Sequence, residues 1–183
     1  MIKRNIEGKL IEVAKKIPVV GILGPRQAGK TTTAKEVFKD HHYVSLENLD
    51  ERDYALTDPK GFLKTNHNGN GLIIDEIQYA PNLLSYIQTM VDESQKPGEF
   101  ILTGSQNFLI NEKISQTLAG RIFLATLLPF SIDELINHNL FSSNIDKTIF
   151  FGFYPRIIAQ KIPPEDWYPS YIRTYIERDV RFN

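Results

Sequence analysis

The chain contains the stretch Gly24-Pro25-Arg26-Gln27-Ala28-Gly29-Lys30-Thr31, which fits the pattern Gly-x4-Gly-Lys-Ser/Thr. The two glycines allow backbone conformations that are closed to residues with a side chain, and they let the backbone approach a ligand closely. The N–H groups of such a loop and the positive end of a following helix converge on an anion. We therefore interpret this stretch as a phosphate-binding loop.

The neighbouring segments agree with this interpretation. Residues 18–23 are short and apolar, as a buried parallel strand should be, and residues 31–38 have the pattern of a helix. We expect Lys30 to place a mobile charge at the β and γ phosphates and the Thr31 hydroxyl to bind Mg²⁺. A glycine-rich turn with a solvated lysine is the alternative. The predicted nucleotide-binding residues are Gly24, Pro25, Arg26, Gln27, Ala28, Gly29, Lys30, Thr31 and Thr32.

A second informative stretch is Leu72-Ile73-Ile74-Asp75-Glu76, an apolar run that ends in two carboxylates. This pattern predicts a buried central strand whose C-terminal end brings acids to the ligand edge of the sheet. We expect Asp75 to hold the Mg²⁺ shell through water, and Glu76 to orient and deprotonate the attacking water. A strand that ends in a solvated acidic turn is the alternative.

A polar residue that contacts the γ phosphate is expected at the end of another strand. Residues 99–103 are predicted to form this strand, and Gly104-Ser105-Gln106 follows it. Ser105 is our first choice, with Gln106 and Thr103 after it. The alternative, in which these hydroxyls cap the next helix, stays open.

An arginine finger is a further predicted catalytic group, and it can come from a neighbouring subunit. Arg121 precedes a predicted strand at residues 122–128, and we place it near the ligand edge of the sheet. An arginine supplied by a neighbouring subunit can stabilise the charge that gathers on the transferred phosphoryl group. Arg156 and Arg178 are alternatives, and a surface ion pair is the other interpretation of Arg121.

Composition excludes several classes of protein. With 183 residues and a formal charge of -1, the chain has no global basic field that would favour nucleic acid, although a local patch stays open. Because it has no cysteine, disulfides, thiol nucleophiles and cysteine metal sites are excluded. No apolar run is long enough to span a bilayer and the N-terminus is too polar for a signal peptide, so we expect a cytoplasmic protein.

We expect a phosphate-loop ATPase core at residues 1–128 and a helical C-terminal subdomain at residues 129–183. Residues 3–16 are predicted to form an amphipathic helix that packs on the sheet and takes no part in chemistry. Ser131-Ile132-Asp133-Glu134 has the sequence of a capping box, which predicts a helix start in the second part.

Taken together, the motifs resemble those of a family of prokaryotic AAA-type ATPases, in which the AAA domain is followed by a C-terminal domain of unknown function. The resemblance implies an α/β fold of the additional-strand, catalytic-glutamate type, with a parallel sheet flanked by helices. It rests on the phosphate loop and, in order, on Ser45-Leu46-Glu47, Asp75-Glu76-Ile77-Gln78, Leu102-Thr103-Gly104-Ser105-Gln106, Leu118-Ala119-Gly120-Arg121, Tyr154-Pro155 and Tyr175-Ile176-Glu177-Arg178-Asp179-Val180.

The chain departs from the family pattern at its end. Such proteins usually continue well past the position of Val180, with winged-helix-like and terminal domains, whereas this sequence ends at Asn183. A truncated chain or a degenerate gene would each account for the difference.

The resulting functional hypothesis is Mg²⁺-dependent ATP binding and hydrolysis coupled to a conformational change. A nucleotide-dependent binding switch with negligible turnover is one alternative, and a small phosphoryl transferase is another. Glu76 argues against the transferase, because a kinase must exclude an activated water. The sequence has no Asn-Lys-x-Asp element for reading guanine, which favours ATP over GTP. Expected partners are ATP, a second copy of the chain and a protein not yet identified, with no membrane.

Overall fold

The computed structural model describes residues 2–105 and 108–176, and these divide into two compact units. Unit 2 comprises Asn5–Pro25 and Lys30–Leu127 and contains the whole sheet. Unit 1 comprises the residues up to Arg4, the segment Arg26–Gly29 and the chain from Leu128 onward. The middle of the phosphate loop therefore groups with the C-terminal helices.

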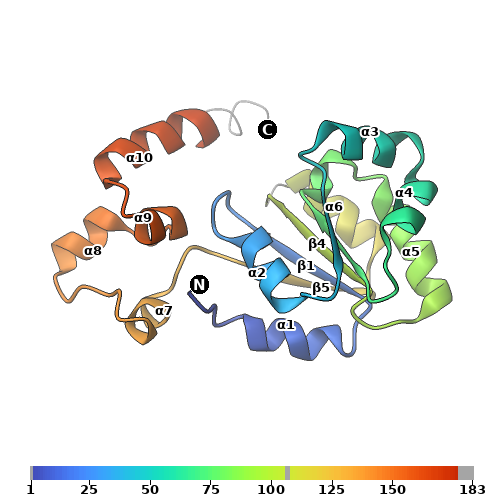
Figure 1. Cartoon of the computed structure of the whole chain (residues 1–183), viewed down its shortest axis with the longest axis horizontal. Helices are drawn as coiled ribbons and strands as arrows, with labels where there is room; N and C mark the ends of the chain where they lie inside the picture. Colours follow the sequence, from blue (N-terminus) through green and yellow to red (C-terminus); the bar gives the residue numbers. More distant parts are fainter. Residues whose placement is uncertain (1, 106–107, 177–183) are drawn as a thin grey trace. The chain divides into compact units, whose positions relative to one another are not determined.

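The sheet of unit 2 has five parallel strands in the order β2-β3-β4-β1-β5 (Figure 1). The fourth strand along the chain, β4, lies between β1, which leads into the phosphate loop, and β3, which carries the two acids. This order confirms the additional-strand fold. The strands are β1 (Val19–Gly24), β2 (His42–Ser45), β3 (Leu72–Asp75), β4 (Phe100–Ser105) and β5 (Ile122–Thr126).

Helices cover both faces of the sheet because successive strand residues point to opposite sides. One apolar cluster joins strand residues such as Ile22 and Ile73 to α1 (Glu7–Ala14) and α2 (Lys30–Val37). The other cluster, which contains Leu23, Ile74 and Leu102, joins the opposite face to further helices. These are α3 (Leu49–Thr57), α4 (Pro59–Asn66), η1 (Ile77–Tyr79), α5 (Leu83–Ser94) and α6 (Phe108–Thr117).

The parallel registers bring the predicted catalytic segments to one edge of the sheet. Gly24 at the end of β1 pairs with Ser105 at the end of β4, and Asp75 ends β3 beside Ser45 of β2. Because all strands run in one direction, their carboxyl ends meet at the same edge. This carboxyl edge is where open α/β sheets bind ligands.

The predicted N-terminal helix is shorter than expected. It begins at Glu7 instead of residue 3, with Leu10 and Val13 buried against the sheet as predicted. Arg4 lies outside the helix, is 6% exposed and belongs to unit 1. The periodicity of the apolar residues could not show this departure, because Arg4 is held by polar contacts.

The described part of unit 1, which ends at residue 176, contains four short helices and a small aromatic core. The Ser131 hydroxyl accepts a hydrogen bond from the Glu134 N–H, and the Glu134 carboxylate accepts one from the Ser131 N–H, which confirms the capping box. The core is built on Ile157, Trp167 and Tyr171. The helices are α7 (Ile132–Asn137), α8 (Ile145–Phe151), α9 (Pro155–Gln160) and α10 (Pro164–Tyr171), and a π-helical turn, Ile172–Ile176, follows.

Candidate functional site

The two glycines of the phosphate loop are required by their surroundings. A Cβ at Gly24 would lie 2.1 Å from the carbonyl oxygen of Leu127, which is too close for any side chain. Gly29 has φ +95°, a conformation that residues with a side chain rarely adopt. Gln27 also has a positive φ, 62°. The loop is therefore folded tightly at the end of β1, as a phosphate-binding turn requires.

The lysine of the motif is the first residue of α2 and is 5% exposed. Its ammonium group donates a hydrogen bond to the carbonyl oxygen of Pro25 at 3.0 Å. This contact holds the charge against the loop backbone, where the motif needs it for a phosphate. Thr32, one residue beyond Thr31, has an exposed side chain, and its contact with nucleotide stays a prediction.

The two residues predicted to hold the metal lie side by side. The Thr31 hydroxyl donates to the Oδ1 atom of Asp75 at 2.8 Å, although the two residues are 44 positions apart. Asp75 is 4% exposed, so its carboxylate needs hydrogen-bond donors. Two more hydroxyls provide them: Thr103 donates to Oδ1, and Tyr43 donates to Oδ2 at 3.0 Å.

The hydroxyls of Tyr43 and Thr103 are engaged with Asp75 and are therefore not available to a ligand. Burial, and then the charge of Asp75, raises the pKa of Tyr43 to about 12, so this phenol stays a donor at neutral pH. The Thr103 hydroxyl is engaged with Asp75 and also lies 3.4 Å from the N–H of Glu76. Thr103 therefore supports both acids. Tyr43 was not predicted, because its reach to Asp75 depends on the pairing of β2 with β3.

This donor set fits Mg²⁺. The ion prefers hard oxygen ligands and usually takes one or two carboxylates, with the remaining positions filled by water and substrate phosphates. Within the described ranges, no group of three or more His, Cys, Asp or Glu side chains gathers at one place. A site built on Thr31 and Asp75 would therefore hold the ion in combination with phosphate oxygens.

Glu76 follows directly after β3 in a left-handed conformation, with φ 59° and ψ 50°. A non-glycine residue in this region is strained by about 1–2 kcal/mol, and such strain concentrates at functional sites. The Gln78 side-chain amide donates a hydrogen bond to the Oε2 atom of Glu76. A Cβ at position 104 would lie 2.7 Å from Gln78 Oε1, so Gly104 makes room for this amide.

Ser105 has the clearest structural signature among the proposed γ-phosphate contacts. It ends β4, is 6% exposed, and its hydroxyl is buried with no hydrogen-bond partner among the described residues. Buried hydroxyls are nearly always paired, so this hydroxyl is suited to donate a hydrogen bond to a ligand or a water molecule. The alternative role for its hydroxyl, a cap of the next helix, has no bond to support it within the described part of the chain. Gln106 lies outside the described residues.

Comparison with known proteins agrees with this geometry. Residues 16–136 match the profile of the family described as AAA domain. The chain belongs to the AAA domain family. Two uncharacterized proteins, from Mycobacterium tuberculosis and Mycobacterium bovis, are each 30% identical to it over 182 residues, which are 97% of this chain. The chain spans about 40% of the length of these curated relatives.

Solved structures show the same fold at low sequence identity. A Walker-type ATPase of Pyrococcus abyssi has a TM-score of 0.58 at 17% identity, over 86% of this chain and 65% of its own. AMPPCP-bound DnaA from Aquifex aeolicus has a TM-score of 0.57 at 15% identity, over 95% of this chain and 64% of its own. At these identities the likeness extends to the fold alone.

The predicted position of Arg121 near the ligand edge is wrong. Its carbonyl accepts a hydrogen bond from the Val19 N–H at 3.1 Å, and Ile122, the next residue, pairs with Val19. Arg121 therefore lies where β1 and β5 of the AAA domain begin, at the amino edge. A residue that precedes a parallel strand is at the edge opposite to the loop, which the sequence interpretation overlooked.

At the amino edge Arg121 forms a bidentate ion pair with Asp92 of α5, with Nε–Oδ1 and Nη2–Oδ2 distances of 2.5 and 2.9 Å. The hydrogen bond from Arg121 holds the pKa of Asp92 below its ordinary value. The Arg121 and Asp92 side chains are partly exposed, at 34% and 44%. Of the alternatives, Arg156 has an exposed side chain that donates to Gln160 on α9, and Arg178 lies outside the described residues.

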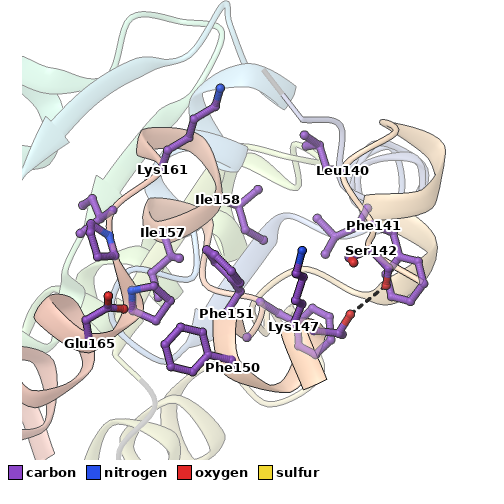
Figure 2. Close-up of a pocket in the computed structure, with 17 residues that line it drawn as sticks. Leu140, Phe141, Ser142, Lys147, Phe150, Phe151, Ile157, Ile158, Lys161 and Glu165 are labelled. Atoms are coloured by element: carbon purple, nitrogen blue, oxygen red, sulfur yellow. Dashed lines mark hydrogen bonds between the residues drawn. The ribbon is translucent and has the colours of Figure 1, made fainter. Parts of the chain in front are cut away.

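Unit 1 also contains an apolar cavity of about 600 Å³, which is lined by residues of α7 to α10 and of the segments between them (Figure 2). Phe150, Phe151 and Ile158 lie along it, and Lys147 and Lys161 are the basic residues in its wall. None of the predicted nucleotide, metal or catalytic residues is part of this wall.

In the described ranges, no helix combines the length and apolar character needed to cross a membrane.

Proposed function

We propose that this chain binds ATP with Mg²⁺ at residues 24–32, hydrolyses it, and couples hydrolysis to a conformational change. The observation that carries the proposal is the 2.8 Å hydrogen bond between Thr31 and Asp75, with Glu76 directly after Asp75 at the carboxyl edge. It joins the loop to the acidic strand end, as a nucleotide hydrolase needs. The likeness to a Walker-type ATPase and to DnaA with bound AMPPCP supports the same proposal.

We assign each side chain of the site a part in this reaction. Lys30 would bind the β and γ phosphates, and the buried hydroxyl of Ser105 would donate to the γ phosphate. Glu76 would accept a proton from water, whose oxygen attacks the γ phosphorus while ADP leaves. Thr31 and Asp75 would hold the metal, Asp75 through water. Mg²⁺, when bound, neutralises charge that develops on the phosphates.

Arg121 enters the proposal as a residue that acts on a neighbouring subunit. The six residues of β1 separate the two edges of the sheet by about 20 Å, at roughly 3.3 Å per residue. Arg121 therefore cannot reach the nucleotide of its own chain without unfolding the strand. The guanidinium at the amino edge is partly exposed, and it would be accessible to a second copy of the chain if it exchanged its ion pair with Asp92.

A nucleotide-dependent binding switch is the second candidate, and one contact favours it. The Gln78 amide occupies one oxygen of the Glu76 carboxylate. A base engaged in this way must exchange that contact before it can orient a water, so turnover would be slow. ATP hydrolysis remains the leading proposal, because the exchange needs only the rotation of a half-buried side chain.

The test is ATP binding by calorimetry together with phosphate release, each measured with Mg²⁺ and after its removal with EDTA. Binding and phosphate release that both depend on Mg²⁺ are expected. Tight binding without measurable release would support the switch. No binding of ATP in the presence of Mg²⁺ would contradict both candidates.

A further inference from the structure

Two carbonyl oxygens in the middle of the phosphate loop accept hydrogen bonds from side chains elsewhere in unit 1. The Ala28 carbonyl accepts a hydrogen bond from Nη1 of Arg4 at 2.8 Å. The Arg26 carbonyl accepts one from the Tyr171 hydroxyl at 3.2 Å. A loop that binds phosphate turns its N–H groups toward the anion, and its carbonyl oxygens then need donors elsewhere. Two segments distant in sequence provide these donors.

Arg4 binds several groups at once. Its Nε atom donates to Glu134 at 3.1 Å, and Nη2 donates to the carbonyl of Leu128 at 2.7 Å. The guanidinium carbon lies 4.8 Å from the centroid of the Phe130 ring. A planar guanidinium can make these bonds together, whereas a lysine ammonium cannot span them.

The acid that balances Arg4 is itself fixed. Glu134 is 4% exposed and belongs to the capping box at the start of α7. A buried ion pair seldom stabilises a fold more than apolar side chains of the same volume would. Positioning of the phosphate loop would explain the buried Arg4–Glu134 ion pair better than stabilisation of the fold does.

Tyr171 connects the loop to the aromatic core of unit 1. Its hydroxyl also lies 3.2 Å from the Tyr154 hydroxyl. Since a phenol has one hydrogen and Tyr171 donates it to Arg26, Tyr154 is the donor in that second bond. The Tyr171 ring stacks on Trp167, with 4.5 Å between centroids and 14° between planes. Trp167 is the one tryptophan of the sequence.

We propose that Arg4 and Tyr171 are positioning residues that turn the loop carbonyls away from bound ATP, and that loop occupancy is transmitted through Tyr171 to Trp167. The inference rests on the proposed function, because it assumes that the loop binds ATP. It adds that hydrogen bonds within unit 1 control the shape of residues 26–29, the middle of the loop. The fluorescence of Trp167 should therefore report nucleotide binding.

The first test compares Tyr171→Phe with Tyr168→Phe, each of which removes one phenol hydroxyl from α10. Tyr168 donates to the Phe151 carbonyl at 3.1 Å, within unit 1 but outside the loop, so it is a matched control. We expect Tyr168→Phe and wild type to show the same change in Trp167 fluorescence when titrated with ATP and Mg²⁺. Tyr171→Phe should lose most of that change and bind ATP about five- to tenfold more weakly, as for one lost hydrogen bond.

The second test replaces Arg4 by lysine, which keeps a charge beside Glu134 but not the planar fork. Arg52→Lys is the control, because Arg52 also bonds a carbonyl, that of Leu46 at 2.8 Å, and lies over a ring, that of Tyr79. Without nucleotide, we expect faster hydrogen exchange of the amides at residues 26–29 in Arg4→Lys only. ATP affinity should fall about tenfold or more, as for a lost charge-assisted bond.

The outcomes separate this inference from the proposed function. If wild type fails to bind ATP, the proposed function is overturned and this inference with it. If wild type binds and Lys30→Ala does not, while Tyr171→Phe and Arg4→Lys match their controls in affinity, fluorescence and exchange, only this inference is overturned. ATP binding that leaves wild-type Trp167 fluorescence unchanged contradicts the transmission through Tyr171. Thermal unfolding of every variant identifies any chain that does not fold, and Tyr171→Phe keeps the test valid if Arg4→Lys is such a chain.

Discussion

The polar side chains at the two edges of the sheet differ in their burial and in their hydrogen bonding. At the carboxyl edge, Asp75 is buried among three hydroxyl donors, and the Ser105 hydroxyl is buried without a described partner. At the amino edge, Arg121 and Asp92 satisfy each other in an exposed ion pair. Burial of polar groups is costly and needs a reason, whereas exposed ion pairs are common and contribute little. Burial and incomplete hydrogen bonding, more than charge, therefore distinguish the candidate site from the opposite edge of the sheet.

The largest effect is expected for Glu76→Gln at the carboxyl edge. The substitution keeps shape and removes basicity, so ATP binding should persist while phosphate release slows by about 10² to 10⁴. Single-turnover phosphate release with calorimetric binding checks both parts. Unchanged turnover would leave Glu76 a structural residue, and an equally slow wild type would favour the switch.

The next effect tests whether the amino edge contributes to catalysis in an assembly. If Arg121 acts on a neighbouring subunit, Arg121→Ala should slow hydrolysis by about 10³. A mixture of inactive Arg121→Ala and Glu76→Gln chains should then regain activity, because a mixed interface can pair both intact residues. Sizing with ATP present must show that the chains assemble.

Asp92→Ala is the matched control for Arg121, since it breaks the same ion pair and leaves the arginine in place. We expect it to retain hydrolysis and to change thermal stability little. Arg121→Ala hydrolysing as fast as wild type, or an assembled mixture that stays inactive, would restrict the amino edge to a surface role.

Lys30→Ala should weaken ATP binding by about 2–5 kcal/mol, the usual cost of truncating a buried charged contact. Calorimetry with ATP and Mg²⁺ measures the change, with Lys35→Ala, a nearby substitution on the same helix, as control. Equal affinity for ATP in wild type and Lys30→Ala would remove the loop from the binding site.

The smallest effect concerns a donor to the buried acid. Tyr43→Phe removes one hydrogen bond to Asp75 and should lower the free energy of unfolding by about 1 kcal/mol at pH 7. Because the folded-state pKa of Tyr43 is raised to about 12, its ordinary value being 10, its contribution is present below pH 10 and is lost between pH 10 and 12.

Denaturant unfolding at pH 8 and pH 11.5 checks this window. The stability difference between wild type and Tyr43→Phe should be smaller at the higher pH. Tyr171 also has a raised pKa, caused mainly by burial, and it is unchanged in both chains, so its titration cancels in the difference. A difference that grows with pH would show that the phenol does not donate to Asp75.

Much of the fold could be predicted because local pattern and global order agree. The apolar runs predicted strands at residues 18–23 and 72–76, close to the observed β1 and β3. The capping box at Ser131 was likewise readable, since both of its bonds are local. The strand predicted at residues 122–128 is shorter, because β5 ends at Thr126 before the chain enters unit 1.

The site residues that belong to sequence motifs could be predicted. Those whose contacts depend on which strands pair, and in which register, could not. The pairing of Thr31 with Asp75 follows from two motifs, whereas the reach of Tyr43 to Asp75 depends on which strands are neighbours. Arg4 gave no signal, because an arginine among spaced apolar residues has the pattern of the polar face of a helix. Gln78 stood within the motif around Asp75, and that position was its only available signal.

The sheet order has a consequence for how the domain is made. Among the described strands, β1 pairs with β4 and β5 alone. These follow it in the chain by 81 and 103 residues in register, from Val19 to Phe100 and Ile122. During synthesis both edges of this apolar strand stay unpaired until the later strands emerge, and pairing of such long range is slow. The phosphate loop at its end can therefore take shape only late. ATP present in the cell would then bind, and so stabilise, only chains that have finished folding.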